Sequence, residues 1–303
     1  MMLKQTCTAL LFISFSNFIN AAAITFNTAL PVAEDEFVNR ELALFKRSGD
    51  DPSGMQRNIN VNALISVLAY GITSDWAIFT KIPYFNKTLD FSLSGQTVSR
   101  KSANFGDPEF FSRMTLMKKN GKGHTFRLAG FAGIKAPIGS DNEHDRFGRL
   151  PSPFQISTGA WDVFGGLVTT WQTLDFEIDN QIAYRNNGKA NHFEAGEQWT
   201  LDSSLQYRLW PSDLASPSKK GMLPTGYLYG VIEVNFLSQK TDKYNNSVDK
   251  NSGGNTLFLS PGLQYVTQRW IIEGVIQKPV IQDLNGSALE NNYSIRTGFR
   301  WNF

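Results

Sequence analysis

The chain ends on a strand pattern that few folds can accommodate. Side chains of opposite character alternate along its last eleven residues, with Tyr293, Ile295, Thr297, Phe299, Trp301 and Phe303 on one face and Ser294, Arg296, Gly298, Arg300 and Asn302 on the other. This period of two predicts a β-strand with one apolar and one polar face. Such an edge would aggregate in water, whereas a closed barrel in a membrane pairs the edge and lets lipid solvate the apolar face. The carboxyl end therefore predicts the closing strand of a transmembrane β-barrel.

The same residues resemble a known sorting signal. From Arg296 to Phe303 the order is polar, x, Gly, x, x, aromatic, x, aromatic, which resembles the signal read by the outer-membrane assembly machinery. The resemblance implies that Gly298, Trp301 and Phe303 form an assembly signal. It also implies that the barrel-assembly machinery is a partner.

The amino end has the features of a secretory signal peptide, which we assign to residues 1–23. Lys4 supplies a positive charge, residues 9–18 form an apolar run, and three alanines ending at Ala23 provide a small-residue cleavage site. The apolar run is too short to span a membrane as a helix. Cys7 is the only cysteine, and its removal would leave a mature chain without disulfides or thiolate ligands. We therefore expect export to the bacterial outer membrane, with lipid as a partner.

Composition excludes several other classes of protein. Beyond the signal peptide, no stretch approaches the roughly 18 to 20 continuous apolar residues of a membrane-spanning helix. Removing Lys4 lowers the formal net charge from +2 to +1, which argues against nucleic acid as a partner. We expect an irregular periplasmic lead-in over residues 24–35 and a single barrel domain over residues 36–303. The sequence leaves open whether the lead-in folds back into the pore.

Ten further stretches alternate in the same way and an eleventh, residues 37–47, alternates weakly, so we predict an all-β fold, an antiparallel up-and-down barrel of about twelve strands. In residues 56–70 the apolar row that includes Ile65 and Val67 is expected to face lipid. In residues 174–185 apolar and mostly acidic side chains alternate most regularly. The stretches are 37–47, 56–70, 76–84, 108–118, 125–138, 160–171, 174–185, 199–209, 227–237, 257–265 and 270–280.

The connections between these stretches are alternately short and long. Most connections after the even-numbered stretches are tight turns, and the exception is residues 211–225. Those after the odd-numbered stretches are long and polar, such as 86–105, 139–155 and 238–255. Outer-membrane barrels have short periplasmic turns, long outer loops and an even strand number, which leaves both termini in the periplasm. In a soluble β-sandwich the connections have no reason to alternate between short and long.

Aromatic residues gather at the ends of the predicted strands, on the apolar face. In a membrane barrel such rings form two girdles at the headgroup level, although any one of them could equally be an ordinary core residue. They are Trp76, Tyr84, Trp161, Trp171, Tyr184, Trp199, Tyr207, Tyr265, Trp270, Tyr293 and Trp301.

Short glycine-centred motifs resemble one family over roughly residues 56–303. The chain resembles the outer-membrane transporters labelled for the MetA pathway of phenol degradation. The resemblance implies a barrel that admits small, aromatic molecules, and it carries over no substrate-binding residue. Pro108 departs from the aliphatic residue expected at that position. The motifs are Tyr70-Gly71-Ile72-Thr73 followed by Trp76, Ile82-Pro83-Tyr84, Phe105-Gly106-Asp107, Ala136-Pro137-Ile138-Gly139 and Thr158-Gly159-Ala160-Trp161-Asp162.

The polar faces of the predicted strands would line the lumen and form the transport path. Their charges divide into a basic arc and an acidic arc, which across a narrow pore would create a transverse field that orients dipolar solutes. Alternatively the charges pair across the interior and fill it, because twelve strands lie between filled and open barrels. The basic residues are Lys81, Arg113, Arg127, Lys135, Arg296 and Arg300, and the acidic ones are Asp162, Asp175, Glu177, Asp179, Asp202, Glu233 and Glu273.

An enzyme would need a base, and the chain offers only His124, His144 and His192. The acidic loop around His144 could hold a metal or an Asp–His pair, but we favour a solvated loop, because clustered side chains lack converging ligand geometry. We therefore expect no catalytic or metal site and no cofactor.

The predicted function is an outer-membrane channel for passive uptake of small molecules, aromatic or hydrophobic compounds among them. A non-conducting structural or surface-binding barrel is the alternative, and an outer-membrane hydrolase a distant third.

Overall fold

The computed structural model describes residues 21–211 and 226–303. The first twenty positions of the expected signal peptide and nearly all of the connection at 211–225 lie outside the described residues. Within the described part of the chain, no helix is long and apolar enough to cross a membrane.

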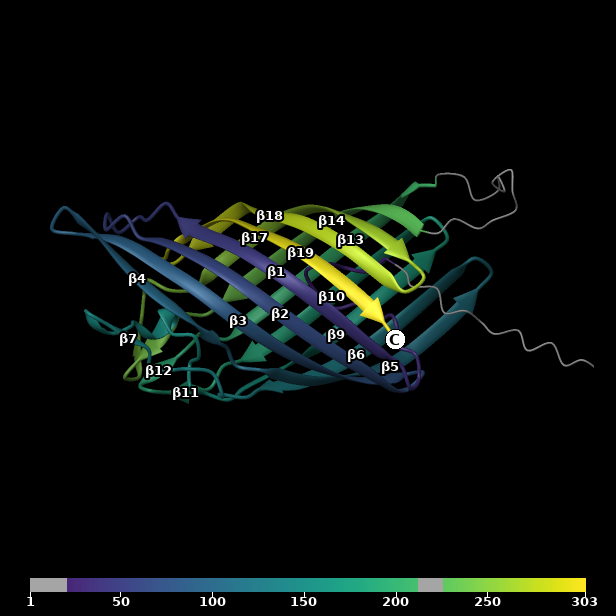
Figure 1. Cartoon of the computed structure of the whole chain (residues 1–303), viewed down its shortest axis with the longest axis horizontal. Coiled ribbons are helices and arrows are strands. Elements are labelled where there is room, and N and C mark those ends of the chain that lie inside the picture. The colour runs from purple at the N-terminus through teal and green to yellow at the C-terminus, as the bar shows by residue number, and fades with distance from the viewer. Residues whose placement is uncertain (1–20, 212–225) are drawn as a thin grey trace, which may run out of the picture.

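Thirteen strands occupy twelve positions in one closed antiparallel barrel (Figure 1). The number differs because β4 and β5 follow one another along the same edge of β3. The barrel closes where β1 pairs with both β2 and the last strand, β19, so the predicted fold class is confirmed. The strands are β1 (Phe37–Gly49), β2 (Asn58–Thr73), β3 (Trp76–Leu93), β4 (Gln96–Phe105), β5 (Glu109–Gly121), β6 (His124–Lys135), β9 (Asp162–Thr173), β10 (Phe176–Asn186), β13 (Gln198–Trp210), β14 (Gly226–Gln239), β17 (Gly254–Thr267), β18 (Trp270–Leu284) and β19 (Glu290–Asn302).

The closing strand has the faces that its sequence predicts. Phe299 and Trp301 are 43% and 51% exposed on the outside, whereas Ser294 is buried on the inside. Beyond the strand end, the Phe303 and Phe37 backbones each donate a hydrogen bond to the other, at 3.0 and 2.9 Å. The two ends of the barrel sheet are thus joined by main-chain bonds, which removes the free edge.

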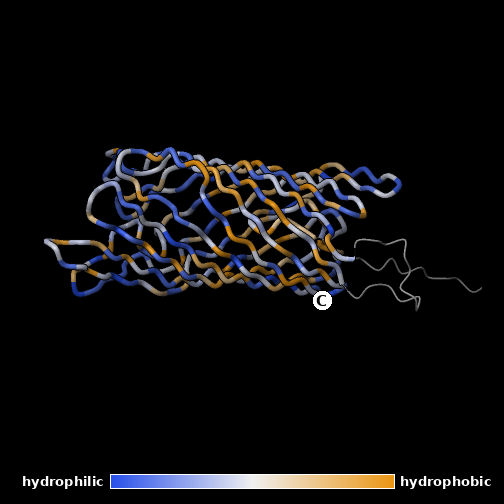
Figure 2. Tube along the Cα trace, turned by 90° about the horizontal axis from the view of Figure 1, so that it is seen from above, coloured by the Kyte–Doolittle hydropathy of each residue, from blue (hydrophilic) through white to orange (hydrophobic). Residues whose placement is uncertain are grey.

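The barrel has a short-turn end, where the chain finishes, and a long-loop end opposite to it (Figure 1). Exposed aromatic residues lie near both ends of the strands, for example Trp76 and Trp171 at the short-turn end and Tyr84 and Trp161 at the other. Hydrophobic residues recur along the wall between these ends, whereas the long-loop end is largely hydrophilic (Figure 2). This distribution matches a barrel whose middle is surrounded by lipid.

Residues 86–105 do not form the polar loop that the sequence predicts. β3 continues to Leu93, turns at Ser94 and Gly95 with φ of 51° and 78°, and returns as β4. The prediction failed because this hairpin lies beyond the exposed aromatic residues and has no lipid-facing apolar row. β4 ends at Phe105, and Gly106 donates to the Pro83 carbonyl oxygen at 2.8 Å before β5 begins.

β2 is turned the other way from the prediction. Leu64 and Leu68 are 63% and 42% exposed on the outside, whereas Ile65 and Val67 line the lumen. The sequence could not decide the orientation, because both rows of this strand are apolar over its second half. The inward row forms an apolar wall, on which Val32 packs against Ala69.

The connections at the long-loop end form a small folded cap. Residues 140–158, here called the cap segment, contain β7 (His144–Asp145), β8 (Gly148–Arg149) and a single helical turn, η1 (Ser152–Phe154). Its Leu150 and Phe154 are buried against Leu89 of β3. A second sheet beside it joins β11 (Lys189–Ala190), β12 (Phe193–Glu194), β15 (Lys243–Tyr244) and β16 (Ser247–Val248).

Candidate functional site: the barrel lumen

A cavity of about 1960 Å³ occupies the barrel interior. Its lining comes from the inner faces of the strands, from the cap segment and from residues that precede β1. Ligand and transport sites are concave and few per protein, so this cavity is the candidate functional site.

Residues 21–35, here called the lumen segment, lie inside the barrel and not beside it. Three of its side chains are buried on different parts of the wall: Ile24 beside Val231, Ala29 beside Ala129, and Val32 beside Ala69. The segment has almost no regular structure, so its backbone groups must find partners on the wall. The question that the sequence left open is thus answered: the lead-in enters the pore.

Carboxylates of the acidic arc accept the N–H groups of the lumen segment. Glu233 accepts hydrogen bonds from Ile24 N at 2.6 Å and from Thr25 N at 3.2 Å. Asp179 accepts one from Ala23 N at 3.2 Å and one from the Thr28 hydroxyl at 2.9 Å. Both carboxylates are fully buried, so the segment satisfies acceptors that water cannot reach.

Guanidinium groups on the opposite wall bind the carbonyl oxygens of the same segment. Arg113 donates to the Thr28 carbonyl at 2.6 Å and also to that of Leu30. Arg296 donates to the Thr25 carbonyl at 3.1 Å. The two charged walls therefore bind the two polarities of one peptide backbone, through charge-assisted hydrogen bonds.

Nearer the long-loop end, the charges that cross the lumen are paired with each other. Glu109 lies 3.1 Å from Lys81 and 2.6 Å from Arg185. Lys135 lies 3.0 Å from Asp107 and 2.8 Å from Asp162. The predicted transport path omits Glu109 and Arg185, although both have the strand parity of the lumen residues predicted on β5 and β10.

The remaining predicted lumen residues fall into three groups. Arg127, Asp202 and Arg300 line the cavity. Glu177 and Glu273 are buried, and Glu273 forms an ion pair with Arg40, which the sequence analysis did not single out. Asp175 lies apart, in the turn before β10, where it pairs with Arg208.

The residues of the expected assembly signal have different positions. Trp301 and Phe303 are 51% and 59% exposed on the outside of the barrel. Gly298 faces inward, where a Cβ atom would lie 2.6 Å from Glu273 Oε1 and 2.7 Å from Leu42 Cδ2. The glycine therefore has a packing reason of its own, independent of any recognition.

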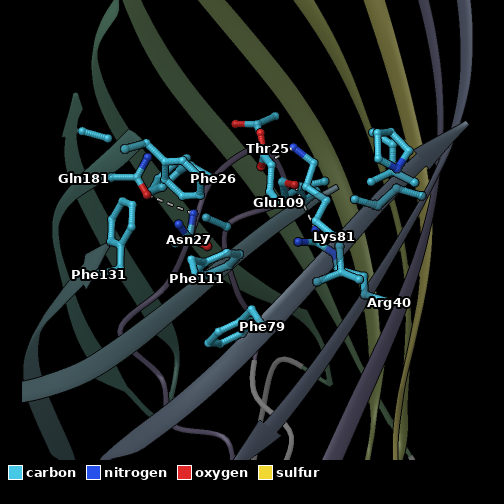
Figure 3. A pocket seen from close by; sticks show the side chains of 18 of the residues that line it. Thr25, Phe26, Asn27, Arg40, Phe79, Lys81, Glu109, Phe111, Phe131 and Gln181 are labelled. Carbon is cyan, nitrogen blue, oxygen red and sulfur yellow. Dashed lines mark hydrogen bonds and ion pairs between the residues drawn. The ribbon is translucent and has the colours of Figure 1, made fainter. Parts of the chain in front are cut away.

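A cluster of phenylalanines lines one side of the cavity. Phe79 and Phe111 are stacked with ring centroids 4.5 Å apart, and Phe131 and Phe164 meet Phe111 edge-on at 6.4 and 6.0 Å. In Figure 3, Phe26 of the lumen segment lies in the same chamber as Phe79, Phe111 and Phe131. Sequence reasoning missed this aromatic wall, because it took every inward face to be polar. Such a wall can stack against a small aromatic or apolar molecule.

The cap segment covers the cavity at the long-loop end. Its residues 152, 153 and 155–158 belong to the cavity lining. The Lys87 ammonium donates to the Gln155 carbonyl at 2.7 Å, and Arg100 forms a bidentate pair with Asp145 at 2.8 and 2.7 Å. The chamber is therefore bounded at one end by the cap segment and at the other by the lumen segment.

The histidines are not grouped for catalysis. His124 is at the start of β6, His192 lies between β11 and β12, and His144 in β7 is exposed with Nδ1 2.7 Å from the Asn142 carbonyl oxygen. None of the three lines the cavity. Over residues 21–211 and 226–303, no three His, Cys, Asp or Glu residues converge as metal ligands would.

Comparison with known proteins identifies a family and several solved structures of similar fold. The family described as "Putative MetA-pathway of phenol degradation" matches residues 46–278. An outer membrane channel from Pseudomonas putida F1 aligns with a TM-score of 0.69 at 9% identity, over 93% of this chain and all of that one. The β domain of the Bordetella autotransporter BrkA aligns with a TM-score of 0.49 at 10% identity, over 89% of this chain and all of that one. No curated protein sequence matches. At 9% identity the likeness to the channel shows a shared outer-membrane barrel fold.

Proposed function

Because the chain belongs to the MetA-pathway family of phenol degradation, we propose that it is a bacterial outer-membrane channel for passive uptake of small molecules, aromatic or hydrophobic compounds among them. The observation that carries this proposal is the cavity of about 1960 Å³, which is lined by phenylalanines on one side and by paired charges elsewhere. An aromatic wall beside polar groups suits a solute such as a phenol, with a ring and a hydroxyl. The proposal needs no cofactor.

The proposed route runs from the long-loop end to the short-turn end. By analogy with other outer-membrane barrels, the long loops would face the outside and the short turns, with both termini, the periplasm. A solute would pass the cap segment, reach the phenylalanines and leave beside the lumen segment. Passage then requires a movement of the two segments that bound the chamber.

Deleting residues 24–35 tests the proposal, because the deletion removes the obstruction and leaves the barrel wall intact. In planar bilayers we expect the single-channel conductance to rise about severalfold over that of the full mature chain, as for a barrel whose plug is removed. In liposome swelling, we expect the full mature chain to admit phenol.

The alternative is a non-conducting barrel, which the tight seating of the lumen segment on both charged walls would favour. Two silent proteins, the full mature chain and the deletion variant, would support that alternative and reject the channel. Heat-shifted mobility on gels is the control for correct folding of both chains.

A further inference from the structure

Residue 24 is bound through its side chain, its nitrogen and its carbonyl oxygen. Its side chain is 2% exposed and packs against Val231 and Val275. Room for it exists because residue 262 is a glycine, whose added Cβ would lie 3.1 Å from Ile24 Cδ1. Its carbonyl oxygen accepts a hydrogen bond from Arg40 at 2.9 Å, and its nitrogen lies 2.6 Å from Glu233 Oε1.

Glu233 has no cation of its own at that place. Among residues 21–211 and 226–303, no ion pair includes Glu233 or its neighbour on the wall, Asp179. Arg296 is directed at the Thr25 carbonyl oxygen instead. The groups that donate hydrogen bonds to Glu233 are neutral: the Ile24 and Thr25 nitrogens and the Thr25 and Ser204 hydroxyls. A fully buried carboxylate with only neutral donors is expensive to keep ionised, and a cation beside it would remove much of that cost.

The expected processing site lies directly before residue 24. The three alanines that end at Ala23 have the small side chains that signal peptidases accept, and cleavage after them makes Ile24 the first residue. In that hydrolysis water adds to the Ala23 carbonyl carbon and the C–N bond breaks. Ala23 keeps a carboxylate, and the Ile24 nitrogen takes up protons to become an ammonium.

We propose that Glu233 and the apolar socket around Ile24 form a binding site for the α-ammonium group that signal-peptide cleavage creates. Cleavage replaces one neutral N–H by a positive charge with three N–H groups, at a nitrogen that already lies 2.6 Å from the carboxylate. It also frees Asp179 and Gln264, which hold Ala23 and Ala22 in the uncleaved chain. Maturation of the chain thereby fastens the lumen segment inside the barrel.

The reactivity of one amine tests this proposal directly. Trypsin releases residues 24–40 as a single peptide, and this peptide contains no lysine, so its only amine is the α-amine of Ile24. The folded mature protein is dimethylated at pH 7 and the peptide is quantified by mass spectrometry. We expect labelling to be about tenfold slower than in the unfolded chain, because a buried amine reacts only when its site opens.

Three variants sharpen the result. Glu233→Gln should bring the labelling rate close to that of the unfolded chain, whereas Glu41→Gln, which changes an exposed carboxylate on the outer face of β1, should keep the amine protected. If Glu233→Gln does not fold, a chain that retains Ala23 moves the amine one residue away from Glu233 and should label rapidly.

Several outcomes would overturn the proposal. One is a mature chain, isolated from outer membranes, whose first residue is not Ile24. The others are labelling as fast as in the unfolded chain, equal protection in Glu233→Gln, or equal protection when Ala23 is retained. None of these measurements depends on solute passage, so they can fail while the proposed channel function stands.

Discussion

Gly298 is part of the barrel wall, and its missing side chain leaves space in the lumen. It pairs with Glu273 across the β18–β19 seam and leaves the space that the Glu273 side chain fills. We predict that Gly298→Ala destabilises the refolded barrel by about 1–3 kcal/mol, the usual effect of overpacking. Urea titration in detergent measures it, with no assembly machinery present. Gly274→Ala is the matched control, because its Cβ would lie 3.9 Å or more from its neighbours; equal stability of the two variants would contradict the prediction.

Phe111 lies at the centre of the aromatic wall and is the residue on which solute preference should depend. Phe111→Ala removes the stacking partner of Phe79 and two edge contacts. We predict that phenol flux into liposomes falls about threefold to tenfold, corresponding to the roughly 0.5–1.5 kcal/mol of an aromatic contact, while glycerol flux is unchanged. Phe110→Ala is the control, since Phe110 is its neighbour on the outer face at 42% exposure. A loss of both fluxes alike would point to misfolding.

Among the elements, the cap segment is held by contacts that depend on pH. Hydrogen bonds from Arg100 hold the pKa of Asp145 below its ordinary value of 3.8. A carboxyl group whose pKa is lowered by folding stabilises the folded form above its unfolded pKa, and this stabilisation is lost as the pH falls through the lowered value. The cap segment should therefore stay closed at neutral pH and loosen below about pH 3.8.

Hydrogen exchange of residues 140–158 checks this expectation. After correction for intrinsic rates, protection should be lower at pH 3 than at pH 6 by a measurable factor, and Asp145→Asn should show low protection at both pH values. Arg149→Ala is the control, because Arg149 donates to two neutral acceptors, the side-chain oxygen of Asn142 and the backbone carbonyl oxygen of Asp141. Protection that is independent of pH in the unaltered chain would reject the pH-dependent closure.

The strands that contact lipid could be predicted from the sequence. The lumen segment, which lies inside the barrel, and β4, which lies beyond the membrane, could not. All twelve predicted stretches are strands, because each alternates between a lipid-facing apolar row and an inward row. β4 has no such row, so residues 96–105 read as loop. The lumen segment shows no alternation of apolar and polar residues, because its backbone is bound by side chains such as Glu233 and Arg113, which are distant in sequence. The positions of these charges were predicted, but their partner was not.

At the scale of the whole molecule, the two charged walls should become evident once the lumen segment is removed. In the chain that lacks residues 24–35, Asp179 loses the hydrogen bond from the Thr28 hydroxyl, and Glu233 loses those from the Ile24 and Thr25 nitrogens. We predict that Asp179→Asn with Glu233→Gln in that background moves ion selectivity toward anions, because the guanidinium wall is then unopposed. Reversal potentials in a salt gradient measure the shift. Unchanged selectivity would reject the idea that the walls act on passing ions.

The seam between β1 and β19 has a consequence for how the molecule comes into being. The lumen segment is continuous with β1, so it is tethered at the very strand that closes the cylinder. A segment joined to an edge strand is most easily bound while the β1–β19 seam is still open. As the barrel closes, the carboxylate wall would then bind the N–H groups of the lumen segment and the guanidinium wall its carbonyl oxygens. Neither wall would be left with its like charges unsolvated. The barrel would then close around its own lumen segment, so that a barrel with an empty lumen need not form during biogenesis.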